Sequence, residues 1–484
     1  MIHKFIHSSI FNSWFSNIVI LFSSLIAIPI VITKLSVEEI NVWFLFASIV
    51  ALSQGVLFGF NGTFARFIAY SNSGIKISEF RDLKSKKKSQ FNEIIDIYEV
   101  GRIFFLMKKV YIFLSIIYAL IIFSVGYFAL YKPIESLTVQ NDGWIAAFIV
   151  ALSTITTLTL GYYQVFLEGI NKVALVQRTM GVVNMIGLLF ILGVLFLHPT
   201  LVSIILVYQL VAMCATLSIV FFGKKEFKKL KIDKDVDRFD KELFLIVWES
   251  AWKSGITTIV ANVVKHISAI LVAQLFTPSA SASFLFTKRI FDIIERFTMI
   301  TFQARIPMIA RYRGRGDFDL LMPYLKQTQY ISYGVFLLGY TAILVGGDYI
   351  LSLIKSNVEL GNISLIILFS FATFLSRYGG MSLAIANQSN HVIEHINAIV
   401  GSVVFFVVVY LFYDYLSINV FPFAQIIAFL FVVYLFIKNV YPTIHTTFFE
   451  YEKKVLLPML GILIFINSIY YWSNPPVSGY LSAQ

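Results

Sequence analysis

The sequence contains few charged residues and almost no cysteine. Asp, Glu, Lys and Arg make up 13% of its 484 residues, whereas soluble proteins carry about 25%. So little charge cannot solvate the several domains that this length implies, which excludes a soluble enzyme and a disordered chain. The single cysteine, Cys214, excludes a scaffold held by disulfide bonds. The sequence also contains no P-loop pattern, so ATP hydrolysis by that route is not expected.

Apolar residues, by contrast, make up 58% of the chain. They gather in runs of about 20 residues, the length of a helix that crosses a bilayer. Because lipid offers no hydrogen bonds to the backbone, such runs must be helical. We therefore expect an all-α polytopic membrane protein with about 12 transmembrane helices, and a count of 13 or 14 stays open. The predicted spans, including a weaker last one, are 10–32, 41–63, 109–131, 144–167, 179–197, 201–222, 253–276, 283–304, 327–350, 362–386, 394–413, 420–437 and 455–472.

The basic residues predict the orientation of these spans. If the amino terminus is cytoplasmic, the inner segments and adjoining span ends hold 30 of the 38 Lys and Arg residues, and the external loops hold only Lys34, Lys132 and Lys355. This distribution follows the positive-inside rule. The net charge of +11 is therefore a signal of topology, and nucleic acid is not an expected partner. The largest cytoplasmic loop, 71–108, is either solvated or bound to membrane lipid.

The two halves of the chain resemble each other weakly. Ser13–Ile18 opens the first span much as Ala251–Ile256 opens the seventh, and Arg66 and Arg311 occupy equivalent places after spans two and eight. Since six spans separate equivalent points, both halves have the same orientation. This pattern predicts two parallel six-helix lobes around a central cavity. The predicted limits are 1–230 and 231–440 for the lobes and 441–484 for a tail with the weaker span.

Charged and polar residues inside the spans are the candidate site residues, because an ion at the membrane centre costs about 2.5–3.5 kcal/mol. Lys288, Asp292 and Glu295 share one face of span eight, and the other two charges of that span lie on a neighbouring face. A self-neutralised ladder that only packs the lobes is the alternative interpretation for this span. The expected cavity cations are Lys265, Lys288, Arg289, Arg296, Arg377 and Arg66, and the expected polar lining is Asn61, Gln164, Asn262 and His266.

Asp292 and Glu295 are the carboxylates nearest the centre of any predicted span. An anionic substrate would compete with them for the neighbouring cations, and a carboxylate released in a desolvated site favours its neutral form. We therefore predict that these two residues couple transport to proton movement.

Two further motifs resemble metal or nucleotide sites. His391, Glu394 and His395 match a zinc-peptidase pattern, but they open a membrane span with no catalytic domain around them. Asp233, Asp235 and Asp237 lie in a short loop that is too small for a nucleotide-binding domain. Neither a metal site nor a cofactor is expected, and the chain is not expected to be an enzyme.

Four stretches resemble bacterial polysaccharide flippases, the O-antigen, Wzx-type transporters of the MATE-like MOP superfamily. The resemblance covers residues 8–440. In many members an acidic residue precedes the glycine that closes span two, and this chain has Asn61 there. The stretches are Ile28–Trp43, Gly59–Arg66, Gly161–Lys172 and Ala304–Arg311 with the following Gly316 and Asp317.

The resemblance implies a flippase that carries an undecaprenyl-diphosphate-linked oligosaccharide across the bacterial cytoplasmic (inner) membrane by alternating access. It also implies a polysaccharide polymerase and a chain-length regulator as partners, and a proton or sodium as the coupling ion. The cation excess within the spans agrees with an anionic lipid diphosphate. The alternatives are a MATE-like drug or cation antiporter and a membrane-embedded glycosyltransferase or polymerase.

Overall fold

The computed structural model describes residues 9–72, 97–231, 239–303, 305–315, 317–387, 394–439 and 441–474. All the regular secondary structure of these residues is helical. Each of the predicted spans lies on a helix, or on the pair α5 and α6, with ends that agree to within a few residues except where the helix extends further. The all-α polytopic prediction is confirmed. Within the described ranges, nine stretches are long and apolar enough to cross a bilayer. Helix α10 (Pro278–Gln303) is not among them, because it carries five charges.

The chain forms two compact units, residues 1–266 and 267–484. The predicted lobe limit at residues 230–231 stays a prediction, because compactness alone does not define a transport lobe. The first unit contains α2 (Ser9–Lys34), α3 (Val37–Asn72), α4 (Ile97–Glu135), α5 (Gln140–Leu160), α6 (Tyr162–Gly169), α7 (Val173–Leu197), α8 (Leu201–Lys229) and most of α9 (Lys241–Leu275).

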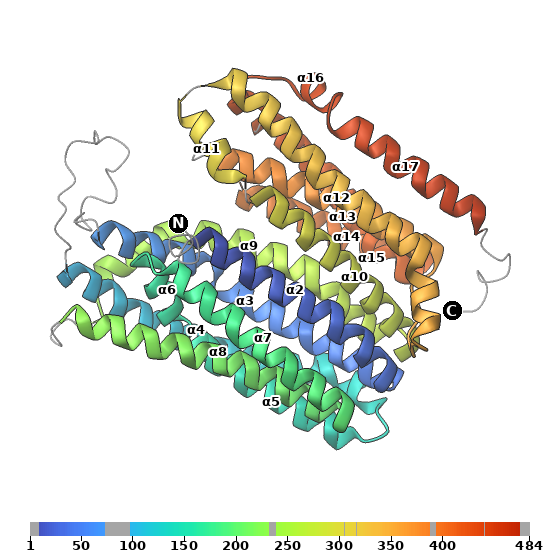
Figure 1. Ribbon diagram of the computed structural model, residues 1–484, viewed down its shortest axis with the longest axis horizontal. Coiled ribbons are helices and arrows are strands. Elements are labelled where there is room, and N and C mark those ends of the chain that lie inside the picture. Colours follow the sequence, from blue (N-terminus) through green and yellow to red (C-terminus); the bar gives the residue numbers. More distant parts are fainter. Residues whose placement is uncertain are drawn as a thin grey trace. The chain divides into compact units, whose positions relative to one another are not determined.

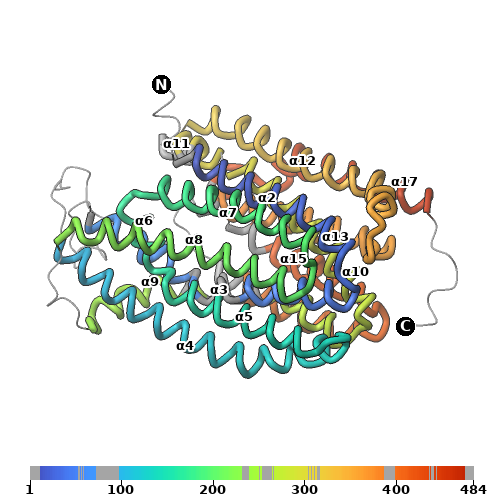
Figure 2. The backbone as a smooth tube through the Cα atoms, turned by 60° about the horizontal axis from the view of Figure 1, so that its bottom comes forward, coloured from blue at the N-terminus to red at the C-terminus, as the bar shows by residue number. Residues whose placement is uncertain are grey.

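Within the first unit, α2 packs along α7, α5 packs along α8, and α4 lies between α3 and α5 (Figures 1 and 2). An aromatic cluster joins α4, α6 and α8, with Phe104 stacked on Phe227 at 4.1 Å between ring centroids and edge-on to Phe166. Large apolar side chains such as Phe113, Leu120 and Phe128 are exposed along α4. Such a surface suits lipid rather than water.

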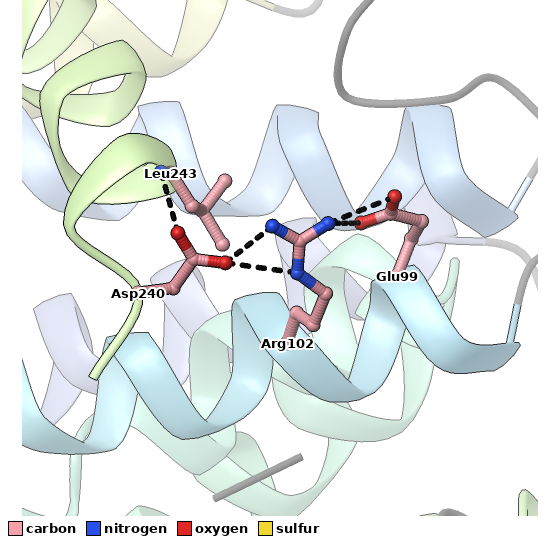
Figure 3. Close-up of polar contacts among 4 residues, drawn as sticks. All are labelled: Glu99, Arg102, Asp240 and Leu243. Carbon is pink, nitrogen blue, oxygen red and sulfur yellow. Dashed lines mark hydrogen bonds and ion pairs between the residues drawn. The ribbon is translucent and has the colours of Figure 1, made fainter. Parts of the chain in front are cut away.

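The N-terminus of α9 is fixed to α4 by an ion pair (Figure 3). Arg102 Nε donates to Asp240 Oδ2 at 2.9 Å, and the same guanidinium contacts Glu99 at 3.0 Å. Asp240 also caps α9, since its Oδ1 accepts from the Leu243 N–H at 2.9 Å. Burial raises the pKa of Asp240, but the hydrogen bonds from Leu243 and Arg102 outweigh burial and hold that pKa below its ordinary value.

A close approach of glycines joins α9 to α3. A Cβ placed on Gly59 would lie 2.5 Å from the Ala251 carbonyl oxygen and from the Gly255 Cα. This contact and the Asp240 ion pair explain why most of α9 belongs to the first unit. Because α4 already begins at Ile97, the expected loop 71–108 is shorter than predicted. Residues 73–96 lie outside the described part of the chain.

The second unit is built around α10 and α13. Helix α10 packs on α12 and α13, α13 packs on α15, and α17 lies along α12 (Figure 1). Phe291 of α10 stacks on Phe369 of α13 at 5.7 Å between centroids, and Tyr333 of α12 stacks on Phe374 at 4.8 Å. The other elements are α11 (Ile306–Arg315), α12 (Phe318–Leu353), α13 (Ile363–Asn387), α14 (Glu394–Leu416), η4 (Ser417–Asn419), α15 (Val420–Asn439), η5 (Tyr441–Ile444), α16 (Phe448–Glu452) and α17 (Leu456–Ser473).

Candidate functional site

A partly buried ion pair lies at the middle of α10. Lys288 is 7% exposed, and its Nζ lies 2.8 Å from Asp292 Oδ2, one helical turn further on. The side chain of Asp292 is 25% exposed, so the pair is only partly removed from solvent or lipid. The pair agrees with part of the alternative interpretation of span eight, a self-neutralised ladder of charges that only packs the lobes.

The second carboxylate of α10 bonds to a different helix. Ser376 Oγ on α13 donates to Glu295 Oε1 at 2.8 Å. The next residue on α13, Arg377, is 4% exposed, and Glu295 attracts its guanidinium. Arg377 Nε has no hydrogen-bond partner among the described residues. The sequence placed Glu295 and Arg377 on separate stripes, and the fold brings them together.

The remaining cations of α10 surround this arrangement. Arg289 is half-buried and Arg296 is exposed. Arg289 repels the Arg296 guanidinium, whereas Asp292 and Glu295 attract it. We name these six residues the α10–α13 charge cluster. It contains four cations and two carboxylates, a surplus of two positive charges, and consists of Lys288, Arg289, Asp292, Glu295, Arg296 and Arg377.

A smaller polar cluster lies in the first unit. Tyr111 OH on α4 donates to Asn61 Oδ1 on α3, and Gln164 Nε2 donates to Glu168 Oε1 at 2.9 Å on α6. Glu168 also acts electrostatically on Tyr111. Asn61 therefore bonds to the buried Tyr111, and Gln164 bonds to the carboxylate that acts on Tyr111. Arg66 is exposed and lies 3.5 Å from Thr63 Oγ1, one turn back on α3.

Three of the predicted residues lie on α9. His266 is half-buried, whereas the side chains of Lys265 and Asn262 are outside the described part of the chain. The side chains of the peptidase-like motif at 391–395 and the acidic loop at 233–237 also lie outside it. That any of the predicted residues contacts a substrate stays a prediction.

Sequence reasoning missed three participants, namely Tyr111, Ser376 and Glu452. Tyr111 and Ser376 each lie on an apolar span where one hydroxyl gives no periodic signal. Ser376 has one available clue, because it directly precedes the mid-span cation Arg377. Glu452 lies between two spans, where a carboxylate is expected to be exposed, yet it is buried.

Solved structures share this fold. An inward-facing MATE family multidrug resistance transporter of the MOP superfamily is 12% identical, with 87% of this chain and 95% of that chain covered and a TM-score of 0.62. The lipid II flippase MurJ is 16% identical, with 96% and 98% covered and a TM-score of 0.54. A MOP superfamily transporter from Pyrococcus furiosus, whose binding pocket is described as having reverse polarity, is 11% identical, with 91% and 98% covered and a TM-score of 0.56.

No protein-family model and no curated protein matches the chain. At the identities above, the likeness to solved structures establishes a shared fold. The chain is a multi-pass membrane protein with the fold of MOP superfamily transporters.

Proposed function

We propose that this chain is a flippase that moves an undecaprenyl-diphosphate-linked oligosaccharide, such as an O-antigen repeat unit, across the bacterial cytoplasmic membrane by alternating access. Two observations support the proposal. The fold is shared over nearly the whole chain with a lipid II flippase, and the α10–α13 charge cluster has a surplus of positive charge. We further propose a cytoplasmic amino terminus, and a polysaccharide polymerase and a chain-length regulator as partners.

The observation that carries the proposal is the environment of Arg377. A guanidinium presents several donors in a fixed fork that suits diphosphate oxygens, and its attraction to them is stronger in a low-dielectric setting. Arg377 is 4% exposed and keeps its Nε donor unused among the described residues. Because it is buried, the proposal requires a state of the cycle in which this face of α13 opens to the lipid headgroup. The other predicted cations would contact the same headgroup.

The fold alone is equally compatible with a MATE-like drug or cation antiporter. A cationic drug, however, needs carboxylates that can face it. Asp292 is paired with Lys288, and Glu295 accepts from Ser376. The net charge of the cluster therefore favours an anionic cargo.

Flipping assays in proteoliposomes test the proposal. The cargo is a fluorescent undecaprenyl-diphosphate-linked glycan, and binding is measured separately on the detergent-solubilised protein. Arg377→Gln should weaken binding about 10- to 100-fold, the value of a hydrogen bond to a charged group. The affinity of Arg377→Lys should lie between that of the parent protein and that of Arg377→Gln, because lysine keeps the charge and lacks the forked donors of the guanidinium.

Lys355→Gln is the matched control, since Lys355 is an exposed cation on the connection after α12. It should bind and flip like the parent protein. Full activity of a normally inserted Arg377→Gln variant would refute the role of Arg377. Transport of a monovalent organic cation, with no binding of the lipid diphosphate, would favour the antiporter.

A further inference from the structure

A buried carboxylate lies outside the membrane spans of the second unit. Glu452 ends the short helix α16 and is 1% exposed. Its Oε1 accepts from Tyr441 OH at 2.6 Å, and its Oε2 accepts from the Leu456 N–H at 3.2 Å. Among the described residues it has no ion-pair partner within 4.0 Å. Ionisation of a buried carboxylate that has no cation beside it carries a large desolvation free energy.

A chain of hydroxyl groups leads from this carboxylate to α13. The hydroxyl groups of Tyr441 and Tyr378 lie 2.7 Å apart, and both side chains are buried. Tyr378 directly follows Arg377, the cation on which the proposed function depends. Glu452 is therefore two hydrogen bonds away from the helix that carries Arg377.

The groups that face Glu452 from the neighbouring helices are mostly uncharged. On α12, Tyr333 lies within electrostatic reach of Glu452, Tyr378 and Arg377, and its buried hydroxyl has no partner among the described residues. Tyr451 OH donates to Gln329 Oε1 at 2.5 Å. The charged side chains nearby are exposed or more remote. Glu450, Lys453 and Lys454 are exposed, and Lys326 Nζ lies 5.8 Å from the centre of the Tyr451 ring.

We propose that Glu452 is a proton-binding site, and that the bound proton reverses the direction of the hydrogen bonds running through Tyr441 to Tyr378 on α13. When Glu452 is ionised, Tyr441 donates its only hydrogen to the carboxylate, so Tyr378 must donate to Tyr441. When Oε1 takes up a proton, the carboxyl group donates to Tyr441, Tyr441 donates to Tyr378, and the Tyr378 hydrogen turns to the hydroxyl of Ser382, which also lies within hydrogen-bond reach of Tyr378. The only bond formed is one O–H bond, and no electron transfer is involved.

The electrostatics of the site place this change near neutral pH. Burial raises the pKa of Glu452 to about 7, although the hydrogen bonds from Tyr441 and Leu456 act to lower it. The inference goes beyond the proposed function, because it holds whatever cargo the chain carries. It also differs from the prediction for Asp292 and Glu295, because Glu452 is neither near the centre of a span nor paired with a cation.

Infrared difference spectroscopy on the full-length protein in lipid tests the proposal without any cargo. Spectra between about pH 5 and about pH 9 should contain a carboxylic-acid carbonyl band that titrates with a midpoint near neutral pH. The band should disappear in Glu452→Gln. It should persist in Glu450→Gln, the matched control on the same helix, because glutamine can replace glutamate in the capping box that Glu450 forms with Thr447.

Tyr441→Phe tests the hydroxyl chain itself. It removes a donor that stabilises the ionised carboxylate, so the midpoint of the band should rise. A wild-type midpoint at the ordinary glutamate value of about 4.3, or an unchanged band in Glu452→Gln, would overturn the proposal. If Glu452→Gln fails to insert, the midpoint in Tyr441→Phe decides, and an unshifted midpoint overturns the proposal.

Discussion

The contact between α3 and α9 offers a test of the packing that positions the candidate residues. Gly59 and Gly62 lie one turn apart on α3, on either side of Asn61 and Phe60. A Cβ on Gly59 would lie 2.5 Å from the backbone of Ala251 and Gly255, whereas a Cβ on Gly62 would meet nothing within 4 Å. The two alanine substitutions are therefore chemically identical and sterically opposite.

The magnitude follows from two effects. Replacing glycine by alanine inside a helix stabilises it by about 1 kcal/mol, and this gain is common to both variants. For Gly59→Ala the helices must separate until the 2.5 Å contacts reach ordinary contact distance, beyond about 3.4 Å. Overpacking of this kind costs about 1–3 kcal/mol. The clashing atoms belong to the backbone and cannot rotate away, so we expect the upper end of that range, about 3 kcal/mol, as the difference between the variants.

Thermal unfolding of both variants in the same detergent measures this difference, because the shared propensity gain cancels. Gly62→Ala should be as stable as the parent protein or slightly more stable, and Gly59→Ala should be clearly less stable than both. Equal unfolding temperatures for the two variants would refute the close approach of α3 and α9. Gly59→Ala should also impair transport, because α9 carries Lys265 and is held against α3 at this point.

Three further predictions concern charged groups and are measured by unfolding of the purified protein. Lys288→Met should lower the free energy of unfolding by about 1–3 kcal/mol, because Asp292 loses its cation. Adding Asp292→Leu should recover most of that loss. Additive losses in the double variant would contradict the pairing. Asp240→Asn should lower the free energy of unfolding by about 0.2–1 kcal/mol near pH 7. This difference should shrink below about pH 4, because the lowered pKa of Asp240 stabilises the fold fully only above the ordinary pKa of an aspartate. The raised pKa of Glu452 stabilises the parent protein at low pH, and this contribution is lost as the pH rises from about 4.5 to about 7. Glutamine does not titrate, so the free energy of unfolding of Glu452→Gln should rise relative to the parent over this range, by about 3 kcal/mol. A pH-independent difference would contradict the burial of the ionised carboxylate.

The helices could be predicted from sequence because the bilayer sets both the length and the apolar composition of a membrane-crossing segment. The spacing of Lys288 and Asp292 likewise predicted a shared helical face, and the ion pair confirms that geometry. Both results depend only on local periodicity. They required no knowledge of which helices are neighbours.

Contacts between helices could not be predicted in the same way. Glu295 shares its face with Lys288 and Asp292, yet it accepts from Ser376 on α13, because the packing of α13 brings that hydroxyl within reach. Asn61 accepts from Tyr111, which lies 50 residues away. A single sequence does not show which residues of different helices meet, since each residue alone is compatible with several neighbours.

The environment of Arg377 argues against a purely structural role for the α10–α13 charge cluster. A buried cation that serves only packing is stable when its donors are all used and its charge is matched. Arg377 meets neither condition, because its Nε has no partner among the described residues and the cluster has two more cations than carboxylates. An apolar side chain of similar volume, such as methionine, would avoid that cost. An anionic ligand that reached α13 would supply both the missing acceptor and the missing charge, so the energetic cost of Arg377 in this state would become binding energy in another.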